Sequence, residues 1–185
     1  MAIRVEPPPS HAVDPATPAA LAEQARAGSS GALGGLYRLF GPALFRLAYR
    51  LTGSKEDAED VVHDVFVGLP EALERYEERG RLDAWLRQLT ARVALMRLRS
   101  SRRRSEVRLE NDAMGAIGAP RDEGIALQAA VDTLPAPLRS VLVLKEVEGY
   151  SHAEIGDILG ISAVASRVRL MRAMSRLRRM LGRAR

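Results

Sequence analysis

The chain has 185 residues, with 28 Lys and Arg against 23 Asp and Glu, a formal net charge of +5. It contains no Cys and only three scattered His, which argues against a disulfide framework, a thiol nucleophile and a metal site. Aromatic residues make up 4% of the chain, so we expect helices packed through aliphatic side chains, and the basic balance favours an anionic partner such as nucleic acid.

Residues 1–30 mix Pro, Ala and Gly without a stable helical period. We predict a mostly disordered N-terminal tail, in which residues 18–27 are only transiently helical. The sequence contains neither a signal-peptide core nor an apolar run of membrane-spanning length. We therefore expect a cytoplasmic protein without membrane insertion.

Residues 31–105 are predicted to form a first helical domain. Apolar residues recur at spacings of three and four over residues 33–51, and Pro42 in this stretch predicts either two short helices or one kinked helix. Ser54 provides the N-cap of the next predicted helix. We expect Pro70 to bend or interrupt that helix before it continues to Glu78.

One face of this second predicted helix is acidic, and it carries Glu56, Asp57, Glu59, Asp60 and Asp64. Two interpretations are open: an ordinary solvated face with favourable charge at a helix N-terminus, or a docking surface for a basic partner protein. No pair of carboxylates accompanies a nucleophile or metal motif, so the pattern does not predict an enzyme.

A polar loop at residues 77–83 leads into a third predicted helix, from residue 84 to about residue 99. It contains the only tryptophan, Trp85, close to Arg87, Gln88 and Arg92. Trp85 is either a core anchor or part of a surface that stacks exposed bases. Residues 106–124 have the composition of a flexible linker and mark a domain boundary.

Residues 125–185 are predicted to form a second domain, with short helices at 125–131 and 138–148 followed by a helix-turn-helix. Ser151 and Glu154 form a capping box, Gly160 ends the first helix of the motif, and Ser162 caps the second. The expected core consists of Leu134, Leu142, Ile155, Leu159 and Val168.

The last helix carries many arginines, and no acidic residue follows Asp157. Its expected apolar stripe consists of Val164, Val168, Met171, Met174, Leu177 and Leu181. The pattern is compatible with a plain surface helix, but arginines without local acidic partners favour DNA phosphates and a helix in the major groove. We thus predict an all-α fold: two small helical domains joined by a flexible linker, the C-terminal one a helix-turn-helix.

Three stretches resemble the extracytoplasmic-function (ECF) sigma factors of the sigma-70 family of RNA polymerase subunits. They are RLTGSKEDAEDVVHDVF at 50–66, LDAWLRQLTARVALMRLR at 82–99 and LPAPLRSVLVLKEVEGYSHAEIGDILGIS at 134–162. The resemblance implies sigma region 2 in residues 31–105 and region 4 in residues 125–185. It also implies promoter recognition without enzymatic activity or cofactor, and regulation through an anti-sigma protein or through expression.

The resemblance also implies roles for individual residues. Docking on core polymerase, at the clamp helices and flap, would use Asp60, His63 and Asp64. Capture of the melted −10 element would use the loop at 77–83 with Trp85, Arg87, Gln88 and Arg92. Reading of the −35 duplex would use Ser162, Ser166, Arg167, Arg169 and Arg172. Which of these last side chains face the bases is open, as is the alternative of a stand-alone helix-turn-helix regulator that binds duplex DNA without polymerase.

Overall fold

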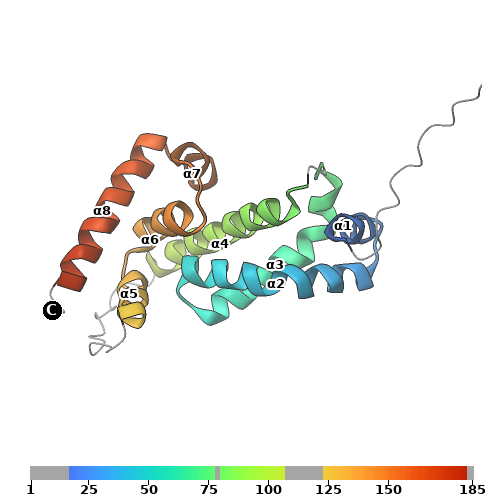
Figure 1. Ribbon diagram of the computed structural model, residues 1–185, viewed down its shortest axis with the longest axis horizontal. Coiled ribbons are helices and arrows are strands. Elements are labelled where there is room, and N and C mark those ends of the chain that lie inside the picture. The colour runs from blue at the N-terminus through green and yellow to red at the C-terminus, as the bar shows by residue number, and fades with distance from the viewer. Residues whose placement is uncertain (1–16, 78–79, 107–122, 183–185) are drawn as a thin grey trace, which may run out of the picture.

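A computed structural model describes residues 17–77, 80–106 and 123–182, and every regular element in these ranges is a helix (Figure 1). The expected all-α fold is confirmed. The elements are α1 (Pro18–Arg26), α2 (Ser30–Thr52), α3 (Lys55–Glu74), α4 (Leu82–Glu106), α5 (Glu123–Asp132), α6 (Ala136–Leu142), the π-helical turn η1 (Val143–Val147), α7 (His152–Leu159) and α8 (Ala163–Gly182).

Helices α2, α3 and α4 form the first domain, because each contributes an apolar stripe to a common core. Its fully buried side chains are Leu36, Leu44, Leu47 and Leu51 of α2, Val61, Val65 and Leu69 of α3, and Leu86 of α4. The predicted N-cap of α3 is present, since the Ser54 hydroxyl accepts a hydrogen bond from the Asp57 amide at 3.2 Å.

Both prolines of the first domain lie inside helices. Pro42 lies within a single continuous α2, and α3 runs through Pro70 to Glu74. The helix is therefore not interrupted at Pro70, and it ends at Glu74 and not at the expected Glu78. Proline removes one helical hydrogen bond, but Leu69 and Leu73 on either side of it are fully buried, and their packing offsets that loss.

The expected N-terminal disorder is wrong for residues 18–26, which form α1; residues 1–16 lie outside the described chain. The Thr17 side chain caps this helix, and its alanines Ala22 and Ala25 are 3% and 1% exposed in the core shared with α2 and α3. Alanines give a weak hydropathy signal but allow close packing, so the contact was not evident from periodicity.

Helices α5 to α8 form the second domain, with a small core of Ala130, Leu134, Leu142, Ala173 and Leu177. Two predicted core residues are placed differently: Leu159 is only partly buried, and Val168 is 36% exposed. Helix α8 buries Ser166, Ala173 and Leu177, whereas Val164 and Met171 of the expected stripe are 60% and 63% exposed. The N-terminal half of the expected stripe thus faces solvent, whereas Met174, Leu177 and Leu181 in its C-terminal half pack on the second core.

The two domains pack against each other, with α6 against α2 and α7 against α4. Val141, Leu144 and Ile155 of the second domain are fully buried in the core cluster of the first domain. Helix α8 lies at the opposite end of the molecule from α1 (Figure 1). Residues 107–122, which include most of the predicted linker, lie outside the described chain.

Candidate nucleic-acid interfaces

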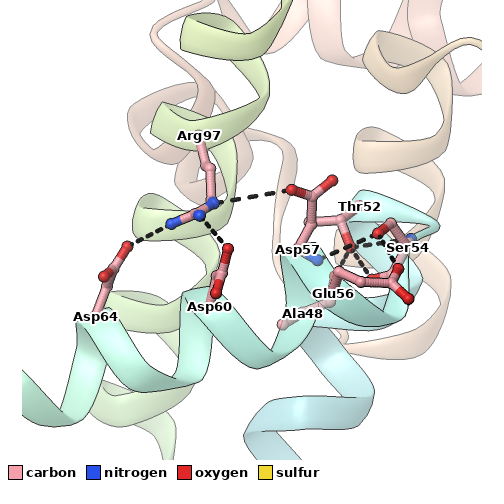
Figure 2. Close-up of polar contacts among 8 residues, drawn as sticks. All are labelled: Ala48, Thr52, Ser54, Glu56, Asp57, Asp60, Asp64 and Arg97. Carbon is pink, nitrogen blue, oxygen red and sulfur yellow. Dashed lines mark hydrogen bonds and ion pairs between the residues drawn. The ribbon is translucent and has the colours of Figure 1, made fainter.

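One face of α3 carries three aspartates that share a single arginine of α4 (Figure 2). The Arg97 guanidinium contacts Asp64 at 2.8 Å and Asp57 at 3.8 Å, and it also donates to Asp60. The side chains of this aspartate cluster, Asp57, Asp60 and Asp64, are still 45% to 57% exposed, and His63 beside them is exposed. The cluster is therefore an accessible acidic surface of fixed geometry.

A pocket lies where α3 ends and α4 begins. The rings of Tyr76 and Trp85 pack with centroids 4.7 Å apart at an angle of 40°. They line a cavity of about 390 Å³ whose other walls are formed by Arg75, Glu77, Arg81, Ala84, Gln88, Tyr150 and Glu154. An aromatic pair with flanking arginines provides a stacking surface and phosphate-binding cations.

Among the residues predicted for −10 binding, Trp85 and Gln88 line this pocket, and Arg87 and Arg92 are exposed on α4. In the predicted loop at 77–83, residues 78–79 lie outside the described chain. Leu82 and Asp83 belong to the first turn of α4, and Leu82 is buried in the core.

The second domain closes one side of the cavity at Tyr76 and Trp85. The Glu148 side chain is only 5% exposed and forms ion pairs with Arg87 at 3.3 Å and Arg50 at 3.9 Å. Tyr150 lies beside it, and burial, with a further contribution from the Glu148 carboxylate, raises the pKa of its phenol. Tyr150 is therefore neutral at physiological pH and able to donate a hydrogen bond.

Arg139 of α6 also joins the two domains. Its buried guanidinium donates to the carbonyl oxygens of Leu51 and Thr52 at the end of α2, at 3.2 and 2.7 Å, and to that of Asp132 at 2.9 Å. Burial lowers the pKa of Arg139, but an arginine remains charged at neutral pH. A cation at the C-terminal end of α2 is favoured by the helix dipole, so this contact stabilises the docked arrangement.

The helix-turn-helix has the local geometry that its sequence predicts. The Ser151 hydroxyl and the Glu154 carboxylate form both bonds of the capping box. These bonds from Ser151 lower the pKa of the Glu154 carboxyl. The backbone of the turn passes so close to Gly156 that a Cβ atom there would lie 2.7 Å from the carbonyl oxygen of Ile161.

The residues predicted for −35 reading are placed unequally on α8. Ser162 caps the helix by accepting from the Ala165 amide at 3.1 Å, Arg167 and Arg172 are exposed, and Arg169 is half-buried. Ser166 is fully buried and lies 2.8 Å from Nδ1 of His152. Its predicted role in base contact is wrong, because the hydroxyl joins α7 to α8 and does not face solvent.

Several residues of these surfaces were not predicted from the sequence, namely Tyr76, Arg97, Arg139, Glu148 and Tyr150. Most of their partners lie far away along the chain; Arg97 and Asp64, for example, are 33 positions apart. Arg139 and Glu148 stand on either side of the apolar stretch at residues 141–144. Charged residues beside such a stretch were the available sequence signal for buried charges.

Within the described residues there is no cluster of His, Asp or Glu suited to a metal ion. Over the same part of the chain, no helix has the length and apolar character needed to cross a membrane.

Fold and surfaces together define an all-helical, two-domain protein with a C-terminal helix-turn-helix and an acidic surface on the first domain. Residues 36–104 match the family model of sigma-70 region 2, and residues 124–177 match that of sigma-70, region 4. The chain is 32% identical to the RNA polymerase sigma factor CarQ of Myxococcus xanthus, over 86% of this chain and 95% of that protein. It is also 32% identical to the ECF RNA polymerase sigma factor SigE of Mycolicibacterium smegmatis, over 77% of this chain and 59% of that protein.

Two solved structures share the fold. The sigma factor RpoE, in complex with the anti-sigma factor NepR from Bartonella quintana, has a TM-score of 0.59 at 23% identity, covering 79% of this chain and 94% of that chain. CnrH, in complex with the cytosolic domain of CnrY, has a TM-score of 0.54 at 27% identity, covering 88% and 95%.

The chain therefore belongs to the ECF group of the sigma-70 family of RNA polymerase sigma factors, which confirms the family resemblance. Members of this family are transcription initiation factors and not enzymes.

Proposed function

We propose that the chain binds core RNA polymerase and directs it to promoters, with the first domain holding the melted −10 element and the second reading the −35 duplex. The observation that carries this proposal is the division of charge. One chain presents an exposed aspartate cluster on α3 and an arginine-rich helix without acidic residues, α8.

The aspartate cluster suits a protein partner and not DNA. Carboxylates repel phosphate, so Asp60 and Asp64, together with His63, are assigned to the polymerase, where a basic surface would complement them. The cavity lined by Tyr76 and Trp85, which we call the base-binding pocket, suits a single strand together with the exposed Arg87 and Arg92. Stacking and phosphate contacts together offset the cost of unstacking.

On α8, the proposal assigns duplex binding to Ser162, Arg167, Arg169 and Arg172, without the buried Ser166. A helix that projects apolar Val164 and Met171 beside arginines can contact both thymine methyl groups and phosphates in a major groove. The chain would act without catalytic activity or cofactor, in the cytoplasm, and an anti-sigma protein is its proposed regulator.

The test is initiation by purified chain and core polymerase on genomic DNA from the same source, with start sites mapped by sequencing. We expect defined start sites that share two upstream elements. The alternative, a stand-alone helix-turn-helix regulator, predicts duplex binding without association with core polymerase and without new start sites.

A double variant tests the docking surface itself. Asp60→Asn with Asp64→Asn should weaken core binding about tenfold, because two exposed charges are lost from the proposed contact. Glu74→Gln with Glu146→Gln removes the same charge from exposed positions outside the cluster and should bind like the wild type. Equal affinities of the two variants would count against the docking role.

A further inference from the structure

We propose that Arg26, the last residue of α1, is a positioning residue for the base-binding pocket, because it fixes the end of α3 that carries Tyr76. The inference rests on the proposed function, and it extends the −10 surface to a helix that lies before the matched region 2, residues 36–104.

Arg26 bridges two backbone carbonyl groups with one side chain. Its Nε donates to the carbonyl oxygen of Leu73 at 2.8 Å, and its Nη2 donates to that of Tyr76 at 2.8 Å. Its remaining nitrogen, Nη1, forms an ion pair with Glu23 at 3.1 Å. The planar guanidinium suits this arrangement, since its donors lie in a fixed fork.

The end of α3 needs such a partner. The last carbonyl groups of a helix have no intrahelical donor, and the helix dipole favours a cation there. The last turn of α3 contains no basic residue, and its cap residue Arg75 keeps a right-handed conformation with φ of −100° in place of a glycine cap. The amide of Tyr76 donates to the Leu73 carbonyl oxygen at 3.2 Å, and Arg26 adds from α1 a second donor to that oxygen, a donor to the Tyr76 carbonyl oxygen and a positive charge.

The helix that carries Arg26, α1, is itself capped and packed on the core. Thr17 caps α1 through the Ala20 amide at 3.2 Å, and Ala22 and Ala25 are buried against the first domain. The backbone of Arg26 is thus held by a helix that packs on the core, and its guanidinium binds the end of α3.

The hydrogen bonds of Arg26 hold the wall of the pocket that contains Tyr76. Tyr76 is 9% exposed, and its ring packs on Trp85, so a shift of its backbone would move the aromatic pair. The opposite wall belongs to α4, which is anchored separately by the fully buried Leu86. Helix α8, to which duplex binding is assigned, lies at the opposite end of the molecule from α1 (Figure 1), so Arg26 should affect single-strand binding and not duplex binding.

The test compares Arg26→Gln, Arg26→Lys and Ala22→Gly in the full chain. The probes are a single strand copied from the strongest start site mapped with wild-type holoenzyme and the duplex segment upstream of it. We expect Arg26→Gln to bind the single strand about tenfold more weakly, as for one or two lost hydrogen bonds, with duplex affinity unchanged. Arg26→Lys, which keeps the charge, should recover part of this loss.

Trp85 is the only tryptophan, so its acrylamide quenching reports the pocket directly, and Arg26→Gln should increase it. Ala22→Gly destabilises α1 without touching the bridge and measures the purely structural effect. The inference would be overturned if Arg26→Gln kept the quenching and the single-strand affinity of the wild type. It would also be overturned if Ala22→Gly, at the same melting temperature as Arg26→Gln, lost as much single-strand affinity. Absence of specific start sites with the wild type would instead remove the proposed function, and quenching would still decide whether Arg26 positions the aromatic pair.

Discussion

Arg97 makes the aspartate cluster a single electrostatic unit. One guanidinium serves Asp57, Asp60 and Asp64, which lie on successive turns of α3 (Figure 2). Without it, three carboxylates on one helix face would repel one another. The residue therefore sets both the stability of this face and the geometry that it offers to a partner.

We predict that Arg97→Gln lowers the free energy of unfolding by about 1 kcal/mol at low ionic strength, a value typical of exposed ion pairs. The loss should become smaller near 1 M salt, where the Debye length is only about 3 Å. Urea unfolding at both salt concentrations measures it. Arg38→Gln, at an exposed arginine of α2 outside the cluster, is the control, and an equal loss there would show that Arg97 has no special role.

At this scale, the sequence predicted the acidic row but not its partner. Residues three and four apart share a helix face whatever the tertiary structure, so Asp57, Asp60 and Asp64 could be grouped from spacing alone. Arg97 comes from another helix, and nothing in local spacing distinguishes it from the neighbouring Arg99. That arginine instead donates to the carbonyl oxygen of Leu159, at 2.8 Å.

At the scale of elements, the turn of the helix-turn-helix is closely packed against α7. The amide of Ile161 donates to the carbonyl oxygen of Gly156 at 3.0 Å, and the backbone of Ile161 occupies the space that a side chain at Gly156 would need. Gly68, inside α3, faces open space. Replacement by alanine should therefore have opposite effects on stability at these two positions.

We predict that Gly156→Ala destabilises the protein by about 1–3 kcal/mol, the usual cost of overpacking, because the clash is with backbone. Gly68→Ala should stabilise it by about 0.5–1 kcal/mol, since alanine is the better helix former. Thermal unfolding followed by circular dichroism gives both signs. A neutral Gly156→Ala would show that the two helices of the motif can separate without cost.

The accuracy of the predicted elements depended on the strength of local signals. Caps and strong periodicity located α3 and α7, with Ser54 and Ser151 at their N-caps. The buried face of α8 was predicted only in part: Leu177 of the expected stripe is buried, whereas Val168 and Met171 are exposed and the short side chain of Ala173 is buried instead. Helix α1 was missed because its buried side chains are alanines.

At the scale of the whole molecule, residues that hold the two domains together also belong to the proposed surface for single-stranded DNA. Arg87 pairs with Glu148 in the described arrangement, and under the proposed function it would exchange that carboxylate for a phosphate. Tyr150 and Glu154 likewise line the pocket that Trp85 and Gln88 would offer to a base. Under the proposed function, association of the two domains and single-strand binding therefore compete for the same face of α4.

We predict that Glu148→Arg separates the domains. The side chain is 5% exposed between Arg50 and Arg87, so the substitution would place a third cation there and weaken the docked state by about 3 kcal/mol. Acrylamide quenching of Trp85 should increase, because the cover from Tyr150 is removed, and the radius of gyration from X-ray scattering should rise. Glu146→Arg makes the same charge change two residues away at an exposed position and should leave both values unchanged. If Glu148→Arg kept wild-type quenching and radius with an intact helical spectrum, Arg139 and the apolar contacts of α6 would suffice to hold the domains together, and the buried carboxylate would have no part in it.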